Sequence, residues 1–101
     1  MIKHLVMFKL ADVAEGNTKR ENALRIKKDL EALKGVIPEI VKIEVCINDD
    51  EAAKDNYDVV LVSEFENLKD LQAYAVHPEH VKVGGFIAKV RTVRAAIDYQ
   101  F

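Results

Sequence analysis

Two of the chain's three histidines and one of its three tyrosines fall within the short segment Tyr74–Val81. Imidazole exchanges protons near neutral pH and a phenol donates hydrogen bonds, so these residue types are typical of a general acid–base site. Pro78 disfavours helix at the residue before it and suits the first position of a new helix, so we expect a helix break here. His80 then lies in the first helical turn, where the positive end of the helix dipole lowers the pKa of an imidazole and favours the neutral base.

One candidate partner of His80 and Tyr74 lies outside this segment. His4 shares the strand parity of Val6 and Phe8, which places it on the core face, where a buried histidine needs a hydrogen-bond partner. His80 or Tyr74 supplies that partner if the helix break overlies the first strand. The candidate catalytic residues are therefore His80, His4 and Tyr74. The alternatives are that both histidines make only structural hydrogen bonds, and that Tyr74 is a core aromatic or a cap on the break.

Other residues that could bind a metal or react have simpler interpretations. His77 precedes Pro78 and is expected to cap the following helix or to face solvent. With His80, and with His4 as a third ligand, it could hold a metal, but this spacing is not diagnostic. Cys46 has the strand parity that points away from the histidines, and we interpret it as a small hydrophobic residue. The candidate residues require no cofactor and no metal.

Composition excludes several classes of partner. The chain has 101 residues, so we expect one domain spanning residues 1–101. Half of the residues are hydrophobic, and 15 basic and 17 acidic residues are interspersed, with a net charge of −2. There is no basic stripe for a nucleic acid and no apolar run that would span a membrane. The single cysteine and the absence of a signal-peptide pattern at the start predict a cytoplasmic protein.

Hydrophobic periodicity predicts the elements that must position these residues. Strand patterns cover Ile2–Leu10, Ile40–Asn48, Tyr57–Phe65 and Arg91–Phe101. Helical patterns run from a capping box at Thr18 to about Lys34, from Leu68 to about Val76, and from Pro78 to about Val90. We expect residues 11–17 and 49–56 to be loops. We also expect Gly84–Gly85 to interrupt the last helix as a turn.

This order, βαββαβ, predicts a ferredoxin-like α+β fold, with a four-stranded antiparallel sheet in the order 4-1-3-2 and helices on one face. On the open face we expect an apolar centre formed by Leu5, Met7, Val60 and Val62. A charged rim is expected from Lys42, Glu44, Arg94 and Asp98. An apolar centre with a polar rim is typical of a protein interface, so the sequence predicts a homodimer through the open sheet face. The alternative is a solvated sheet face with scattered hydrophobic residues.

Two stretches resemble one known family. The opening Ile2-Lys3-His4-Leu5-Val6-Met7-Phe8-Lys9 and the segment Tyr74-Ala75-Val76-His77-Pro78-Glu79-His80-Val81 together resemble the stress-responsive A/B barrel family of the dimeric α+β barrel superfamily. The resemblance covers nearly the whole chain and implies the same fold and a dimer. Most of that family is known as stress-associated or uncharacterised proteins.

The resemblance also implies roles for particular residues. A plant member of the family cyclises a linear polyketide by an aldol reaction, with a histidine in the place of His80 as general base. A tyrosine and a histidine in the places of Tyr74 and His4 line its pocket. A second pocket tyrosine falls near Leu30 in this chain, and leucine cannot donate a hydrogen bond. The resemblance therefore extends to a general acid–base pocket, and Leu30 is where this chain departs from the cyclising enzyme.

Three functions follow as hypotheses. The first is a small-molecule pocket between sheet and helices, with acid–base chemistry on a carbonyl-containing or aromatic compound. The second is a non-enzymatic stress-associated dimer in which the same residues form a structural cluster. The third is a cofactor-independent monooxygenase. A pocket of roughly 300 Å³ or more beside His80 favours the first, whereas aromatic and aliphatic side chains filling that space favour the second.

Overall fold

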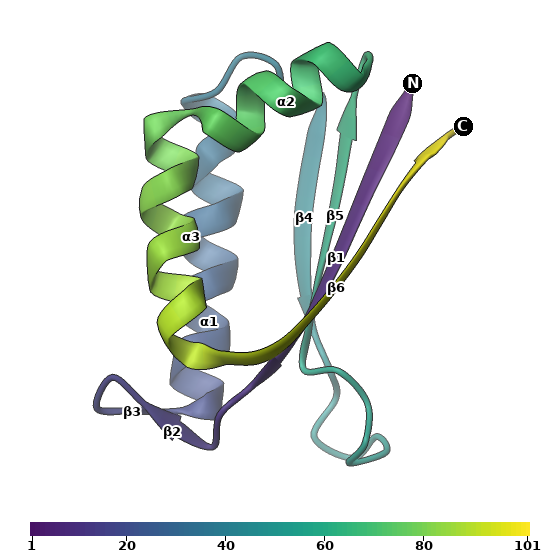
Figure 1. The fold of residues 1–101 in the computed structure, drawn as a ribbon. Helices are drawn as coiled ribbons and strands as arrows, with labels where there is room; N and C mark the ends of the chain where they lie inside the picture. Colours follow the sequence, from purple (N-terminus) through teal and green to yellow (C-terminus); the bar gives the residue numbers. More distant parts are fainter.

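The computed structural model describes all residues, 1–101, and shows a four-stranded antiparallel sheet with helices on one face (Figure 1). The strands lie in the order β4-β5-β1-β6, which is the predicted order 4-1-3-2 counted over the four long strands. They are β1 (Ile2–Leu10), β4 (Lys42–Ile47), β5 (Val59–Phe65) and β6 (Arg91–Gln100). The helices are α1 (Lys19–Glu31), α2 (Leu68–Val76) and α3 (Pro78–Val90). None of them combines the length and the apolar character needed to cross a bilayer.

The central strand β1 holds the core and one of the candidate residues. Its inward residues Ile2, Val6, Phe8 and Leu10 are all buried, as the sequence parity predicts. His4 lies on this same face, opposite Ser63 of β5 and Asp98 of β6. Because β1 is hydrogen-bonded on both sides, the backbone of His4 is firmly fixed.

Helix α1 forms where the capping box predicts it. The Thr18 hydroxyl accepts a hydrogen bond from the Glu21 N–H, and the Glu21 carboxylate accepts one from the Thr18 N–H. Its buried face includes Ala23, Ile26 and Leu30, at the spacing of an amphipathic helix. The α-helix ends at Glu31, earlier than predicted, and continues as the 3₁₀ turn η1 (Ala32–Gly35), a common way for a helix to end.

The predicted loop before α1 contains a small hairpin that the sequence analysis does not foresee. Strands β2 (Val13–Ala14) and β3 (Asn17–Thr18) pair with each other. The two residues between them, Glu15 and Gly16, have φ angles of 51° and 77°. Two consecutive positive φ angles are what a tight two-residue hairpin requires, and glycine adopts one of them at little cost.

The break between α2 and α3 falls where Pro78 predicts it. Helix α2 begins after Asn67, whose side chain accepts a hydrogen bond from a backbone N–H at 2.8 Å, and it ends at Val76. His77 then caps α3, because its Nδ1 accepts a hydrogen bond from the Glu79 N–H at 3.1 Å, and Pro78 is the first helical residue. The expected capping role of His77 is therefore confirmed.

Helix α3 is continuous from Pro78 to Val90, so the predicted turn at Gly84–Gly85 is wrong. Glycine in a helix interior costs about 1 kcal/mol relative to alanine, which tertiary packing of the helix outweighs. Ile87 and Val90 of α3 are buried in the core. A Cβ added at Gly84 would have no packing neighbour within 4 Å, and Gly84 lines the cavity described below.

The two sets of alternating residues in strand β6 face the opposite sides of the sheet from those predicted. Arg94 and Asp98 are predicted on the rim of the open face, and this assignment is wrong. Asp98 lies opposite His4 and Arg94 lies opposite Phe8, and residues directly opposite in an antiparallel pair share a face. Both side chains therefore lie on the helix side. The physical reason is that His4, on the helix side, needs a polar partner, which Asp98 supplies. The apolar residues of β6, such as Ala95 and Ile97, then lie on the open face.

The open face is consequently more apolar than predicted. Ile97 of β6 lies opposite Leu5, and Ala95 lies opposite Met7. Several hydrophobic side chains of this face are strongly exposed, including Met7, Val93, Ile97 and Tyr99. A shallow apolar hollow of about 150 Å³ lies on it, lined by Leu5, Met7, Val60, Ala95, Ala96 and Ile97. The rim keeps Lys42 and Glu44, which share the face of Val62.

Candidate functional site

A cavity of about 360 Å³ lies between the sheet and the helices. Its polar side chains come from four elements and include all three predicted residues: His4, Gln72, Tyr74, His80, Arg91, Arg94 and Asp98. The rest of the lining is mainly aliphatic and aromatic. Its volume is within the range of small-molecule sites, roughly 300 Å³ and above. Phe8 contributes to the wall without filling the space, and Phe86 packs against Arg25 instead, with 3.7 Å between guanidinium carbon and ring centroid.

His80 is held in one tautomer by the end of the preceding helix. Its Nδ1 lies 3.0 Å from the carbonyl oxygen of Ala75. A carbonyl only accepts hydrogen bonds, so Nδ1 carries the proton and Nε2 of the neutral ring is left with a free lone pair. Ala75 is in the last turn of α2, where carbonyls lack intrahelical partners. The helix break predicted from Pro78 therefore supplies the acceptor that orients His80.

The environment of His80 favours its neutral form. Burial is the main cause that lowers the pKa of His80 below its ordinary 6.5. The hydrogen bond to Ala75 opposes this shift, and the basic side chains of His4 and Arg94 add to it. The lowered pKa matches the prediction, whereas the predicted cause was the helix dipole alone. A buried imidazole is harder to charge because the charged form loses its hydration.

Tyr74 is buried next to His80 and its hydroxyl has no partner. The residue is 1% exposed, and its ring centroid lies 4.3 Å from that of His80 and 5.0 Å from that of Phe65. The phenolic oxygen is buried and makes no hydrogen bond in the chain. Burial strongly raises the pKa of Tyr74, so the group stays a protonated donor. An unpaired buried donor beside a cavity is suited to a polar atom of a ligand.

We expect Tyr74→Phe to stabilise the unliganded protein. The substitution removes a buried donor that has no partner, and such a group costs about 1–3 kcal/mol. The free energy of unfolding, measured by urea denaturation, should therefore rise by about 1 kcal/mol or more. The aromatic packing against Phe65 and His80 is retained, so no cavity is created. A loss of stability of similar size would contradict the absence of a partner and would assign the hydroxyl a structural role.

His4 pairs with Asp98, a partner that the sequence analysis does not name. Its Nδ1–H donates to the carboxylate Oδ1 of Asp98 across the β1–β6 ladder. The His4 ring centroid lies 6.3 Å from that of Tyr74 and 6.5 Å from that of Phe65, both in edge orientations. Asp98 thereby fixes the ring and the tautomer of His4. The sequence does indicate that a histidine facing the core needs a partner. Finding Asp98 as that partner also requires knowing which residues of β6 face the helices.

Two further positions considered in the sequence analysis lie at different distances from the cavity. Leu30 lines the cavity from α1 and adds an apolar side chain. Cys46 is exposed on β4 opposite Val60, away from the cavity. The structure has no group of three histidine, cysteine or acidic side chains placed to hold a metal ion.

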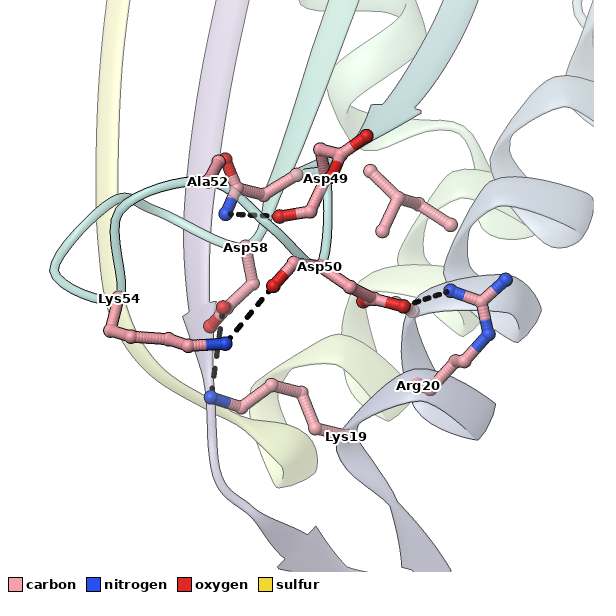
Figure 2. Close-up of a pocket in the computed structure, with 10 residues that line it drawn as sticks. Lys19, Arg20, Asp49, Asp50, Ala52, Lys54 and Asp58 are labelled. Carbon is pink, nitrogen blue, oxygen red and sulfur yellow. Dashed lines mark hydrogen bonds and ion pairs between the residues drawn. The ribbon is translucent and has the colours of Figure 1, made fainter.

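A second hollow, of about 150 Å³, lies at the first turn of α1, beside the loop that contains Asp49 and Asp50 (Figure 2). Its charged side chains are satisfied within the chain. Arg20 pairs with Asp50 at 3.9 Å and Lys19 with Asp58 at 3.6 Å. Lys54 donates to the Asp50 carbonyl at 3.0 Å. This hollow therefore has charged groups that bind one another, unlike the unpaired hydroxyl of Tyr74 beside His80.

The sheet order and the helices on one face define a ferredoxin-like α+β protein, with a cavity between its sheet and helices. The chain belongs to the family described as the Stress Responsive A/B Barrel Domain, which it matches over residues 2–101. No curated protein matches the chain at a significant level.

Solved structures with similar folds include proteins of unknown function and proteins with a named activity. A dimeric protein of unknown function with a ferredoxin-like fold from Bacteroides fragilis is 39% identical, with 99% of this chain and 95% of that chain covered and a TM-score of 0.81. A hydroxynitrile lyase from Passiflora edulis is 14% identical, with 97% and 90% covered and a TM-score of 0.76. An antibiotic biosynthesis monooxygenase is 12% identical, with 100% and 98% covered and a TM-score of 0.75. The last two likenesses show the fold alone.

Proposed function

We propose that this protein binds a small carbonyl compound in the cavity and removes a proton from the carbon next to the carbonyl group, with His80 as general base. The proton passes to Nε2 of His80, and the electron pair moves to the carbonyl oxygen to give an enolate. The hydroxyl of Tyr74 donates a hydrogen bond to that oxygen. No cofactor is needed for this step.

The observation that carries the proposal is the state of His80. It lines the cavity, its Nδ1 is occupied by the Ala75 carbonyl, and its Nε2 has no partner in the chain. The lowered pKa keeps Nε2 unprotonated near neutral pH. A general base needs a lone pair available at the operating pH and an acid or donor for the charge that develops. Tyr74, whose ring is 4.3 Å from that of His80, provides that donor.

A structural cluster is the main alternative, and the pairing pattern argues against it. Side chains that form a structural polar cluster satisfy one another's hydrogen bonds. Here His80 bonds only a backbone carbonyl, His4 bonds Asp98, and the buried hydroxyl of Tyr74 bonds nothing in the chain. Three aromatic polar residues therefore lie together without using their polar atoms on one another. No contact in the cavity favours the third hypothesis, a cofactor-independent monooxygenase.

We also propose that two copies of the chain associate through the open sheet face. The support is the continuous apolar surface around Leu5, Met7 and Ile97, together with the relative from Bacteroides fragilis, which is described as dimeric. An exposed apolar patch of this kind on a small protein is typical of an interface. The cavity lies on the opposite side of the sheet and is formed within one chain.

Blocking the cavity from α3 tests the proposal with a matched pair of variants. Gly84 lines the cavity, whereas Gly85 is exposed and does not. The probe is the fluorescent aryl ketone Prodan, whose emission reports transfer to an apolar site. We expect Gly84→Leu to weaken Prodan binding about tenfold or more, because the new side chain occupies ligand volume. Gly85→Leu should bind like the wild type, and equal binding by both variants would contradict a ligand site here.

A further inference from the structure

We propose that one end of the cavity binds the carboxylate of the substrate, through Arg91 and Arg94, so that the substrate is an anionic carbonyl compound. This inference rests on the proposed function and names the class of compound that the same site takes. Both arginines line the cavity with His80 and Tyr74. Guanidinium groups present planar pairs of donors that match a carboxylate.

An irregularity in the sheet brings the two arginines to the same face. Residues three apart on a regular strand point to opposite faces. The β1–β6 register shifts between Lys9 and Leu10, so that Arg94 lies opposite Phe8 and Arg91 lies opposite Leu10. Phe8 and Leu10 are both buried core residues. The bulge therefore turns Arg91 to the helix side, and bulges of this kind often redirect a side chain next to a functional site.

Neither arginine has a partner within the chain. Nine ion pairs form in the molecule, and none includes Arg91 or Arg94. The one acidic side chain in the cavity lining, Asp98, is bonded to His4. The cavity lining therefore contains two guanidinium groups without an ion-pair partner and a single carboxylate, which is bonded to His4. An incoming anion would meet attraction without displacing an existing ion pair.

The rest of the lining sets the shape of such a compound. Tyr74 is 1% exposed and its buried hydroxyl makes no hydrogen bond in the chain, so it is a second, independent group without a polar partner. Leu30, Leu71 and Ile87 make an apolar wall. The arrangement fits a molecule with an apolar body, a carbonyl group that reaches Tyr74 and His80, and a carboxylate at the end near β6.

The test compares 3-benzoylpropionate, an aryl ketone with a carboxylate, with its neutral amide, by isothermal titration calorimetry at low ionic strength. We expect the wild type to bind the acid about tenfold or more tightly than the amide. Arg94→Gln should remove most of this preference, because the acid loses a charged partner that the amide does not need. Arg20→Gln is the control, because Arg20 pairs with Asp50 at 3.9 Å in the hollow of Figure 2, outside the cavity.

The outcomes separate this inference from the function on which it rests. Equal affinity of the wild type for acid and amide would overturn the anion site while leaving a ketone-binding cavity in place. The same loss of preference in Arg20→Gln and Arg94→Gln would also overturn it, since the effect would then come from overall charge. Failure of both compounds to bind at millimolar concentration would count against the inference and the cavity together. His80→Asn should keep the preference for the acid, because it removes the base and not the arginines.

Discussion

Replacing Met7 with glutamate is expected to convert the proposed dimer into monomers. Met7 lies at the centre of the open face and is 40% exposed in the single chain, so a charged side chain there can be hydrated in a folded monomer. The interface of a symmetric dimer contains the same patch of both subunits, so it would contain two new carboxylates without partners. An unpaired buried charge costs about 3 kcal/mol or more, which raises the dissociation constant more than a hundredfold. Sedimentation velocity measures the change directly.

Leu24→Glu is the matched control for this substitution. Leu24 is an exposed hydrophobic residue of α1, 46% exposed, and gains the same charge on the helix side of the molecule. It should sediment as the wild type does. A wild-type chain that is monomeric at micromolar concentration, or a Met7→Glu variant that remains dimeric, would show that the open face is not the interface.

Replacing His80 with asparagine is expected to slow the proposed proton abstraction strongly while preserving the fold. The asparagine side-chain amide can still donate to the carbonyl of Ala75, but it has no basic nitrogen. Loss of a general base typically lowers the rate by about 10²–10⁴-fold. The measurement is deuterium incorporation from D₂O into 4-phenyl-2-butanone next to its carbonyl group, followed by NMR. This neutral ketone makes the result independent of the arginines.

His77→Asn provides the control for His80→Asn. His77 caps α3 through Nδ1, and asparagine is a favourable capping residue, so this variant should keep both stability and exchange rate. If His80→Asn exchanged deuterium as fast as the wild type, His80 would not be the base. If both asparagine variants lost the same activity, the effect would come from the helix break and not from the imidazole.

The sequence predicts the backbone of this site well, because local signals decide it. The capping box at Thr18, the proline at 78 and the period of β1 each determine an element without reference to distant residues. The turn at Gly84–Gly85 fails as a prediction for a tertiary reason. Two glycines lower helix propensity, but burial of Ile87 and Val90 holds the helix together.

The composition of the site is harder to predict, because it depends on the face that β6 presents. Alternation in β6 shows that its two parities differ but does not say which one faces the helices. The rule that apolar residues point to the core gives the wrong answer here, since the open face is itself apolar. The error moves Asp98 and Arg94 away from the cavity. Arg91 is harder still, because its orientation depends on a register shift between two strands far apart in sequence.

The most direct test of the account is the protonation state of His80, read by NMR of protein labelled with ¹⁵N-histidine and titrated with acid. We predict that neutral His80 carries its proton on Nδ1 and that its pKa is below 6.5, since burial disfavours the charged ring. Any activity that uses His80 as base should therefore fall as the pH drops through that lowered pKa. A proton on Nε2 of the neutral ring, or a pKa at or above 6.5, would contradict the assignment of His80 as the base.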